Sequence, residues 1–144
     1  MKCAFELQLI AEVKAKEIAE RIAKEKAERE ERERLAREKR TLQFCEQLGE
    51  RLENIAKNGH FPETDFLAMT SGFLLSKAHS NPVMYSYNPY EEKLDFKVLE
   101  NWFASYCFKI SYKHEKGIVH PENYAHGRVE REIFRVTISP EPKC

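Results

Sequence analysis

Residues 24–34 read KEKAEREERER, a stretch in which every residue except Ala27 is charged and acids are interleaved with bases. It lies within residues 1–57, where Gly49 is the only glycine and proline is absent. Ala, Glu, Lys, Arg, Leu and Gln dominate this segment, and all of them favour helices. We therefore predict one long helix over residues 1–57, or two helices that nearly join, ended by Asn58 and Gly59.

Apolar residues of this segment fall into two groups at helical spacing, separated by the charged stretch. The gap removes about two heptads of apolar seam, so a continuous coiled coil is not expected. Apolar helix faces require burial, so we expect the first group to contact a partner protein or a second copy of the chain. The alternative is that this group folds back on its own domain. The first group is Phe5, Leu9, Ile10, Val13, Ile18 and Ile22, and the second is Leu35, Leu42, Cys45, Leu48, Leu52 and Ile55.

The pattern divides the chain into a charged helical arm, residues 1–40, for interaction or oligomerisation, and a compact domain, residues 41–144. Within the domain, apolar spacing predicts a helix over residues 63–79 with Thr64 as its N-cap, and a second helix over 95–105. A short strand is expected over 83–87. Period-two alternation over 106–112 and 128–139 predicts two strands of an antiparallel hairpin with a long loop. The fold class is therefore α+β.

The order of these elements, three helices before a β-hairpin over residues 41–139, is similar to that of a winged-helix domain. That resemblance implies nucleic-acid binding, with the third helix reading DNA. Residues 95–105, DFKVLENWFAS, depart from it, because Lys97 is their only base and lies beside Asp95 and Glu100. Direct base readout is not expected from such a helix.

The hairpin offers a second route to nucleic acid or to an acidic protein. Basic residues recur on the outward parity of both strands and beside the loop, where they would follow a phosphate backbone. The competing interpretation is a polar sheet face with cross-strand ion pairs. The candidate residues are Lys109, Lys113, Lys116, Arg128, Arg131 and Arg135.

Three tyrosines in a Pro- and Asn-rich segment, Tyr85, Tyr87 and Tyr90, are further candidates for partner binding, since tyrosine often anchors protein interfaces. His114, His120 and His126 surround the hairpin loop, but their spacing matches no ligand pattern, so we expect no metal. The chain carries no nucleophile elbow, phosphate-binding loop or dinucleotide motif. We expect no catalytic site and no cofactor.

Formal net charge is zero, which disfavours a general polyanion binder. Four widely spaced cysteines, Cys3, Cys45, Cys107 and Cys144, are expected to be free thiols in the cytoplasm. No segment has the length and apolarity of a membrane span, and no membrane partner is expected.

The layout is similar to that of small accessory regulators or inhibitors that phages and mobile elements encode against host complexes. The expected function is therefore a non-enzymatic interaction module that binds a host protein or nucleoprotein complex, or a second copy of itself. The alternative is a winged-helix-like nucleic-acid-binding protein that uses the basic hairpin face.

Overall fold

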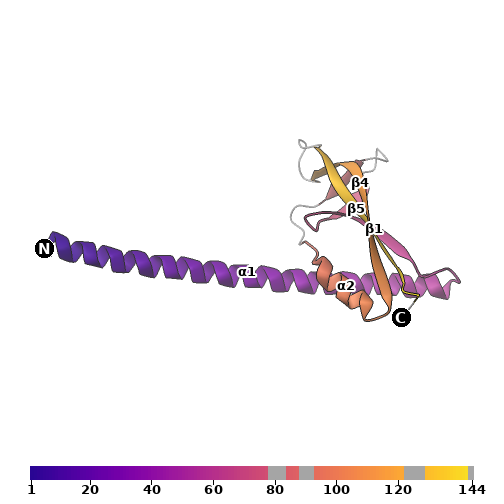
Figure 1. Cartoon of the computed structure of the whole chain (residues 1–144), viewed down its shortest axis with the longest axis horizontal. Helices are drawn as coiled ribbons and strands as arrows, with labels where there is room; N and C mark the ends of the chain where they lie inside the picture. Colours follow the sequence, from indigo (N-terminus) through magenta and orange to yellow (C-terminus); the bar gives the residue numbers. More distant parts are fainter. Residues whose placement is uncertain (78–83, 88–92, 122–128, 143–144) are drawn as a thin grey trace. The chain divides into compact units, whose positions relative to one another are not determined.

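The structure is a computed structural model that describes residues 1–77, 84–87, 93–121 and 129–142 (Figure 1). Its elements follow in the order α1, β1, β2, β3, α2, β4 and β5, which confirms the predicted α+β class. The chain divides into two compact units, Met1–Ala36 and Arg37–Cys144.

The predicted long helix is present as the single helix α1, Ala4–Lys57. Its end is stabilised by two backbone hydrogen bonds, from Gly59 N to the Ala56 carbonyl oxygen (3.0 Å) and from His60 N to the Ile55 carbonyl oxygen (3.1 Å). Gly59 has a φ of 81°, the left-handed conformation that this type of helix end requires. The Asn-Gly signal thus marks the end of the helix at the predicted place.

Residues 1–35, which lie almost entirely in the first unit, are all exposed. The charged stretch closes ion pairs along its own surface, including Lys26 to Glu30 (4.0 Å) and Arg34 to Glu31 (2.6 Å). The hydrogen bond from Arg34 lowers the pKa of the Glu31 carboxyl. Pairs of this kind support a helix that has no packed face of its own.

The second unit is organised around the last part of α1, where Thr41, Cys45, Leu48 and Leu52 form one buried stripe. The core there also includes Leu99 and Phe103 of α2, Phe96–Ala104, and Ile138 of β5, Val129–Pro140. α2 begins at the predicted place. The carboxylate of its N-cap Asp95 accepts hydrogen bonds from the backbone N–H groups of Lys97 (3.0 Å) and Val98 (3.3 Å).

The predicted helix over residues 63–79 is wrong. In its place are strand β1, Thr64–Met69, and strand β2, Leu74–Lys77, which pair antiparallel. The turn between them is closed by bonds from Gly72 N to the Met69 carbonyl oxygen (2.9 Å) and from Met69 N to the Phe73 carbonyl oxygen (2.9 Å). Gly72 has a φ of 96°, a conformation that glycine adopts readily, and this residue makes the turn. Thr64 therefore begins a strand and caps no helix.

The strands pair in the order β1-β2-β3-β4-β5, and β5 pairs back on β1, so the sheet closes on itself. All pairings are antiparallel except that of β3, Met84–Tyr87, with β4, Phe108–Pro121. The predicted antiparallel hairpin is confirmed as β4 and β5, and β4 is longer than expected because it extends through residues 113–121. Its predicted loop now falls on residues 122–128, outside the described residues. Because a hairpin replaces the second predicted helix, the element order no longer matches that of a winged-helix domain.

The cysteines only partly follow the prediction. Cys3 is exposed and free, and Cys45 is buried and free. Cys107, in the turn after α2, is disulfide-bonded, so the prediction of free thiols is wrong at this position. Spacing along the chain carried no signal for this bond, because disulfide pairing is set by distance in the fold. Cys144 lies outside the described residues.

Candidate functional site

The apolar residues of the helical arm are all exposed. Their exposed fractions are 67% for Phe5, 47% for Leu9, 41% for Ile10, 56% for Val13, 45% for Ile18 and 57% for Ile22. Leu7, which the sequence prediction left out, is 46% exposed as well.

These side chains lie on two sides of the helix. Phe5, Leu9 and Val13 follow each other at four-residue steps and form one stripe. Leu7 lies two residues after Phe5, which places it about 200° around the helix axis at 3.6 residues per turn. Ile18 and Ile22, about three and four turns further along the helix, lie on the same side as Leu7 and form the second stripe with it. Ile10 lies between the two stripes. One flat partner surface therefore covers only half of these residues.

The basic hairpin residues are only partly brought together. Lys113 lies opposite Arg135 in the strand register. Lys109 lies four residues before Lys113 on β4 and is therefore on the same face of the sheet. Lys116 has the opposite parity and lies on the other face. The backbone of Arg131 pairs with Gly117, but its side chain, and all of Arg128, lie outside what the structure describes.

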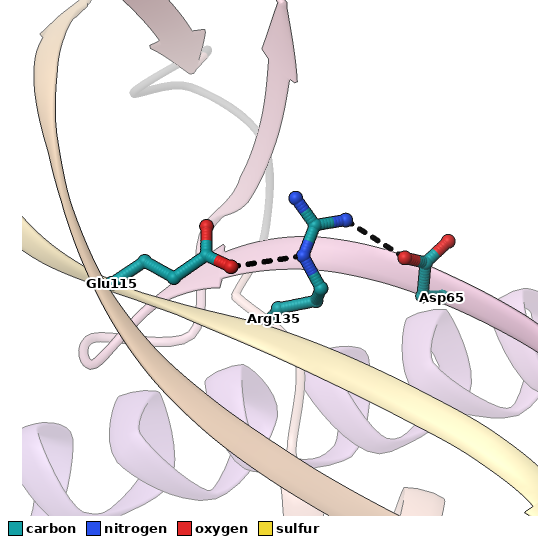
Figure 2. A network of polar contacts seen from close by, with 3 residues as sticks. All are labelled: Asp65, Glu115 and Arg135. Atoms are coloured by element: carbon teal, nitrogen blue, oxygen red, sulfur yellow. Dashed lines mark hydrogen bonds and ion pairs between the residues drawn. The ribbon is translucent and has the colours of Figure 1, made fainter. Parts of the chain in front are cut away.

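Arg135 is bound by two carboxylates from neighbouring strands (Figure 2). Its Nη1 lies 2.7 Å from Asp65 Oδ2 on β1, and its Nε lies 3.0 Å from Glu115 Oε1 on β4. These two hydrogen bonds raise the pKa of the Arg135 guanidinium, and the bond that Arg135 donates to Glu115 contributes most. The network connects three strands of the sheet, and its two carboxylates offset the positive charge that Arg135 would offer to a phosphate.

The tyrosine candidates contribute mainly to packing within the second unit. The Tyr85 ring lies so close to Gly117 that an added Cβ there would be 2.9 Å from it. The Tyr87 ring lies 5.1 Å from that of Phe73, centroid to centroid. Both tyrosines are half-buried, and Tyr90 lies outside the described residues.

Of the three loop histidines, only His114 has a described side chain. His114 Nε2 lies 3.2 Å from Glu132 Oε2, and its ring packs on Phe134 with centroids 5.0 Å apart. The side chain of His120 and all of His126 lie outside the described residues. Among the residues that are described, no group of three potential metal ligands occurs.

The second unit also contains an apolar pocket that the sequence did not predict. Its volume is about 520 Å³, and it lies between the last turns of α1, the end of α2 and the start of β4. Four aromatic residues line it, and their rings contact one another: Trp102 with Phe103 at 4.8 Å, Trp102 with Tyr106 at 4.7 Å, and Phe103 with Phe108 at 6.1 Å between centroids. Tyr106 is 61% exposed, so the aromatic wall is open to solvent.

All charged residues that line this pocket are glutamates: Glu46, Glu50 and Glu53. They follow at steps of four and three along α1 and therefore share one helix face. Within the described part of the chain, none of them forms an ion pair or a side-chain hydrogen bond. Gly49 lies among them, and a Cβ added there would be 3.2 Å from Trp102 Cη2, so the indole ring packs directly against this stretch of helix.

Two signals in the sequence anticipate this pocket. One is the spacing of the three glutamates beside Gly49, the only glycine of the long helix. The other is the run of aromatic residues from Trp102 to Phe108. Each signal alone is ordinary, and only the fold places them together.

Comparison with protein-family models, with curated proteins and with solved structures finds no significant match to this chain. No helix in the described part of the chain is long and apolar enough to cross a membrane.

Proposed function

We propose that this protein is a non-enzymatic interaction module whose helical arm binds another protein. The supporting observation is the exposure of its apolar side chains: the six predicted residues and Leu7 are each at least 41% exposed. Full burial of such a side chain is worth roughly 1.5–3 kcal/mol, whereas association costs roughly 4–15 kcal/mol. Three residues on one side would barely offset that cost, so a stable complex needs both stripes of the arm.

This requirement restricts the partner. The two stripes lie about 200° apart, so the arm fits a groove that encloses it or a bundle in which it touches at least two helices. A pairwise coiled coil would leave one stripe in water. A protein groove and a bundle of several copies of this chain both satisfy the geometry.

The role that fits best is that of a small accessory regulator or inhibitor, of the kind phages and mobile elements encode, that acts by occupying a surface of a host protein or nucleoprotein complex. In this role the second unit presents the hairpin face and the exposed parts of Tyr85 and Tyr87 as a further contact surface. The chain then contributes surface and no chemistry of its own.

The test uses the full chain with each stripe altered separately. One variant carries Phe5→Gln, Leu9→Gln and Val13→Gln, and a control carries Lys16→Gln, Glu20→Gln and Lys24→Gln on the same helix. Sedimentation analysis over a wide concentration range measures self-association, and co-purification with hydrogen exchange of residues 4–34 measures partner binding.

We expect the apolar variant, but not the control, to lose the complex, and we expect the amides of residues 4–34 to exchange slowly only within it. A matching variant of Leu7, Ile18 and Ile22 should have the same effect. If the chain is monomeric throughout and both stripe variants retain every bound partner, the arm has no binding role.

Nucleic-acid binding through Lys109, Lys113 and Arg135 remains the second choice, because Arg135 is already held by Asp65 and Glu115. Binding of this kind would weaken steeply with salt. Absence of DNA and RNA retention at low ionic strength would exclude it.

A further inference from the structure

We propose that the aromatic pocket of the second unit binds a lysine or arginine side chain that a partner protein presents next to an apolar residue. The pocket is the space lined by Trp102, Phe103, Tyr106, Phe108 and the three glutamates of α1. It is separate from the exposed stripes of the arm, and its ligand class is independent of what the arm binds.

Its size and lining suit one or two side chains. A volume of about 520 Å³ lies within the range of roughly 300–1,000 Å³ in which proteins hold small ligands. Leu52, Ala56 and Pro62 complete an apolar lining that would accept the neighbouring side chain of the partner.

The aromatic rings favour a cation over a neutral ligand. Trp102 and Tyr106 lie with centroids 4.7 Å apart and ring planes at 50°, and both residues line the space. The face of an indole attracts ammonium and guanidinium groups more strongly than other aromatic faces do, and a guanidinium also stacks on it. The exposure of Tyr106 leaves this corner accessible from solvent.

Charge complementarity selects the same ligand. Glu46, Glu50 and Glu53 are the only charged groups of the lining, and none forms an ion pair among the described residues. A carboxylate pairs with guanidinium in a bidentate geometry, and the stem of a lysine or arginine packs against apolar surface. An anionic segment would be repelled by all three.

A second copy of this chain fits less well. From residue 12 to residue 35 the exposed part of α1 has both acids and bases in every turn, so this stretch would bring glutamates toward Glu46, Glu50 and Glu53. A basic segment of a different protein has no such conflict.

The experiment uses the full chain and three peptides of equal length: one rich in arginine and leucine, the same peptide with glutamine for arginine, and the same with glutamate for arginine. Trp102 is the only tryptophan, so its fluorescence reports binding at the pocket directly. The variants are the triple change Glu46→Gln, Glu50→Gln and Glu53→Gln, and the single change Tyr106→Ala. Tyr106 is 61% exposed, so its removal leaves the fold intact.

We expect saturable binding of the arginine peptide, at least tenfold weaker binding of the glutamine peptide and none of the glutamate peptide. The triple variant should bind the arginine peptide at least tenfold more weakly, and this binding should depend less on salt. Tyr106→Ala should bind the arginine peptide several-fold more weakly. The matched control, Glu25→Gln with Glu28→Gln and Glu33→Gln, removes the same charge outside the pocket and should bind like the parent. The arm variant at Phe5, Leu9 and Val13 should also bind like the parent, which separates this proposal from that for the arm.

Three results would overturn the proposal. The first is no binding of the arginine peptide, and the second is equal binding of all three peptides, which would indicate a purely apolar groove. The third is a dimer of the full chain that Tyr106→Ala dissociates, which would place a second copy in the pocket.

Discussion

Replacing Thr41 by valine should destabilise the second unit by about 2 kcal/mol. Thr41 is completely buried on α1, and its hydroxyl serves both as donor and as acceptor. It donates to the Arg37 carbonyl oxygen at 2.8 Å and accepts from the backbone N–H of Asp95 at 2.8 Å. The second bond connects α1 to the N-cap of α2, across 54 positions of the chain.

Valine keeps the shape of threonine but has no oxygen. The Arg37 carbonyl oxygen still accepts its backbone hydrogen bond within the helix, so losing the additional bond from the Thr41 hydroxyl costs little stability. The Asp95 N–H loses its acceptor, and leaving a part-buried donor without a partner costs about 1–3 kcal/mol. For a domain of about 100 residues, a loss of about 2 kcal/mol lowers the melting midpoint by roughly 10 °C.

Trp102 fluorescence during urea or thermal unfolding is the appropriate measurement, because the first unit contributes helix signal to circular dichroism without reporting on the core. Thr41→Ser is the control: it keeps the oxygen and loses only a methyl group, so it should cost clearly less than Thr41→Val. If valine leaves the free energy of unfolding within about 0.5 kcal/mol of the parent, or serine costs as much as valine, the bond from Asp95 has no such role.

Four further outcomes are expected. Gly72→Ala should cost about 2–3 kcal/mol in unfolding measurements, because its φ is 96° and its new Cβ would lie 2.8 Å from a backbone carbonyl oxygen; a cost below about 1 kcal/mol would contradict this geometry. Burial raises the pKa of the Cys45 thiol to about 11, so at pH 8 a thiol reagent should label exposed Cys3 quickly and Cys45 only on unfolding. Because the folded pKa of Cys45 exceeds its ordinary value of 9.0, unfolding releases a proton between about pH 9 and 11, and the second unit should lose stability as pH rises through that window. Arg135→Gln should cost less than about 1 kcal/mol by chemical denaturation, because the arginine side chain is 37% exposed and its ion pairs are screened by water; a larger loss would show that the network is structurally essential.

Local signals predicted the elements whose formation depends on near neighbours. The absence of proline and the abundance of helix formers predicted α1, and Asn58-Gly59 predicted its end. Apolar spacing over residues 95–105 predicted α2, and period-two alternation over residues 106–112 and 128–139 predicted the β4-β5 hairpin. In each case the deciding contacts lie within a few residues or across one hairpin.

The prediction of a helix over residues 63–79 was wrong because the apolar residues there fit both the helical period of 3.6 residues and the strand period of two. Phe66 and Phe73 are at helical spacing, but Phe66 and Ala68 also alternate as a strand, and Ala68 is completely buried. The decision comes from β5, which pairs with all of β1 from Thr64 to Met69, far along the chain. Gly72 was the one local clue, since its positive φ suits a turn and not a helix interior.

The candidate sites also depend on contacts between residues far apart in the chain, which the sequence alone does not reveal. The arm was predicted only in part: its apolar residues were expected to contact a partner or, alternatively, to fold back on their own domain, and in the structure they are exposed. The aromatic pocket was not predicted, because Glu46, Glu50 and Glu53 look like an ordinary solvated face until Trp102 is placed against Gly49 between them. A glycine inside a long helix of strong helix formers costs stability, roughly 0.5–1 kcal/mol relative to alanine. The close approach of the indole ring gives that cost a structural reason, and it is also what builds the acidic, aromatic wall that we propose as a binding site.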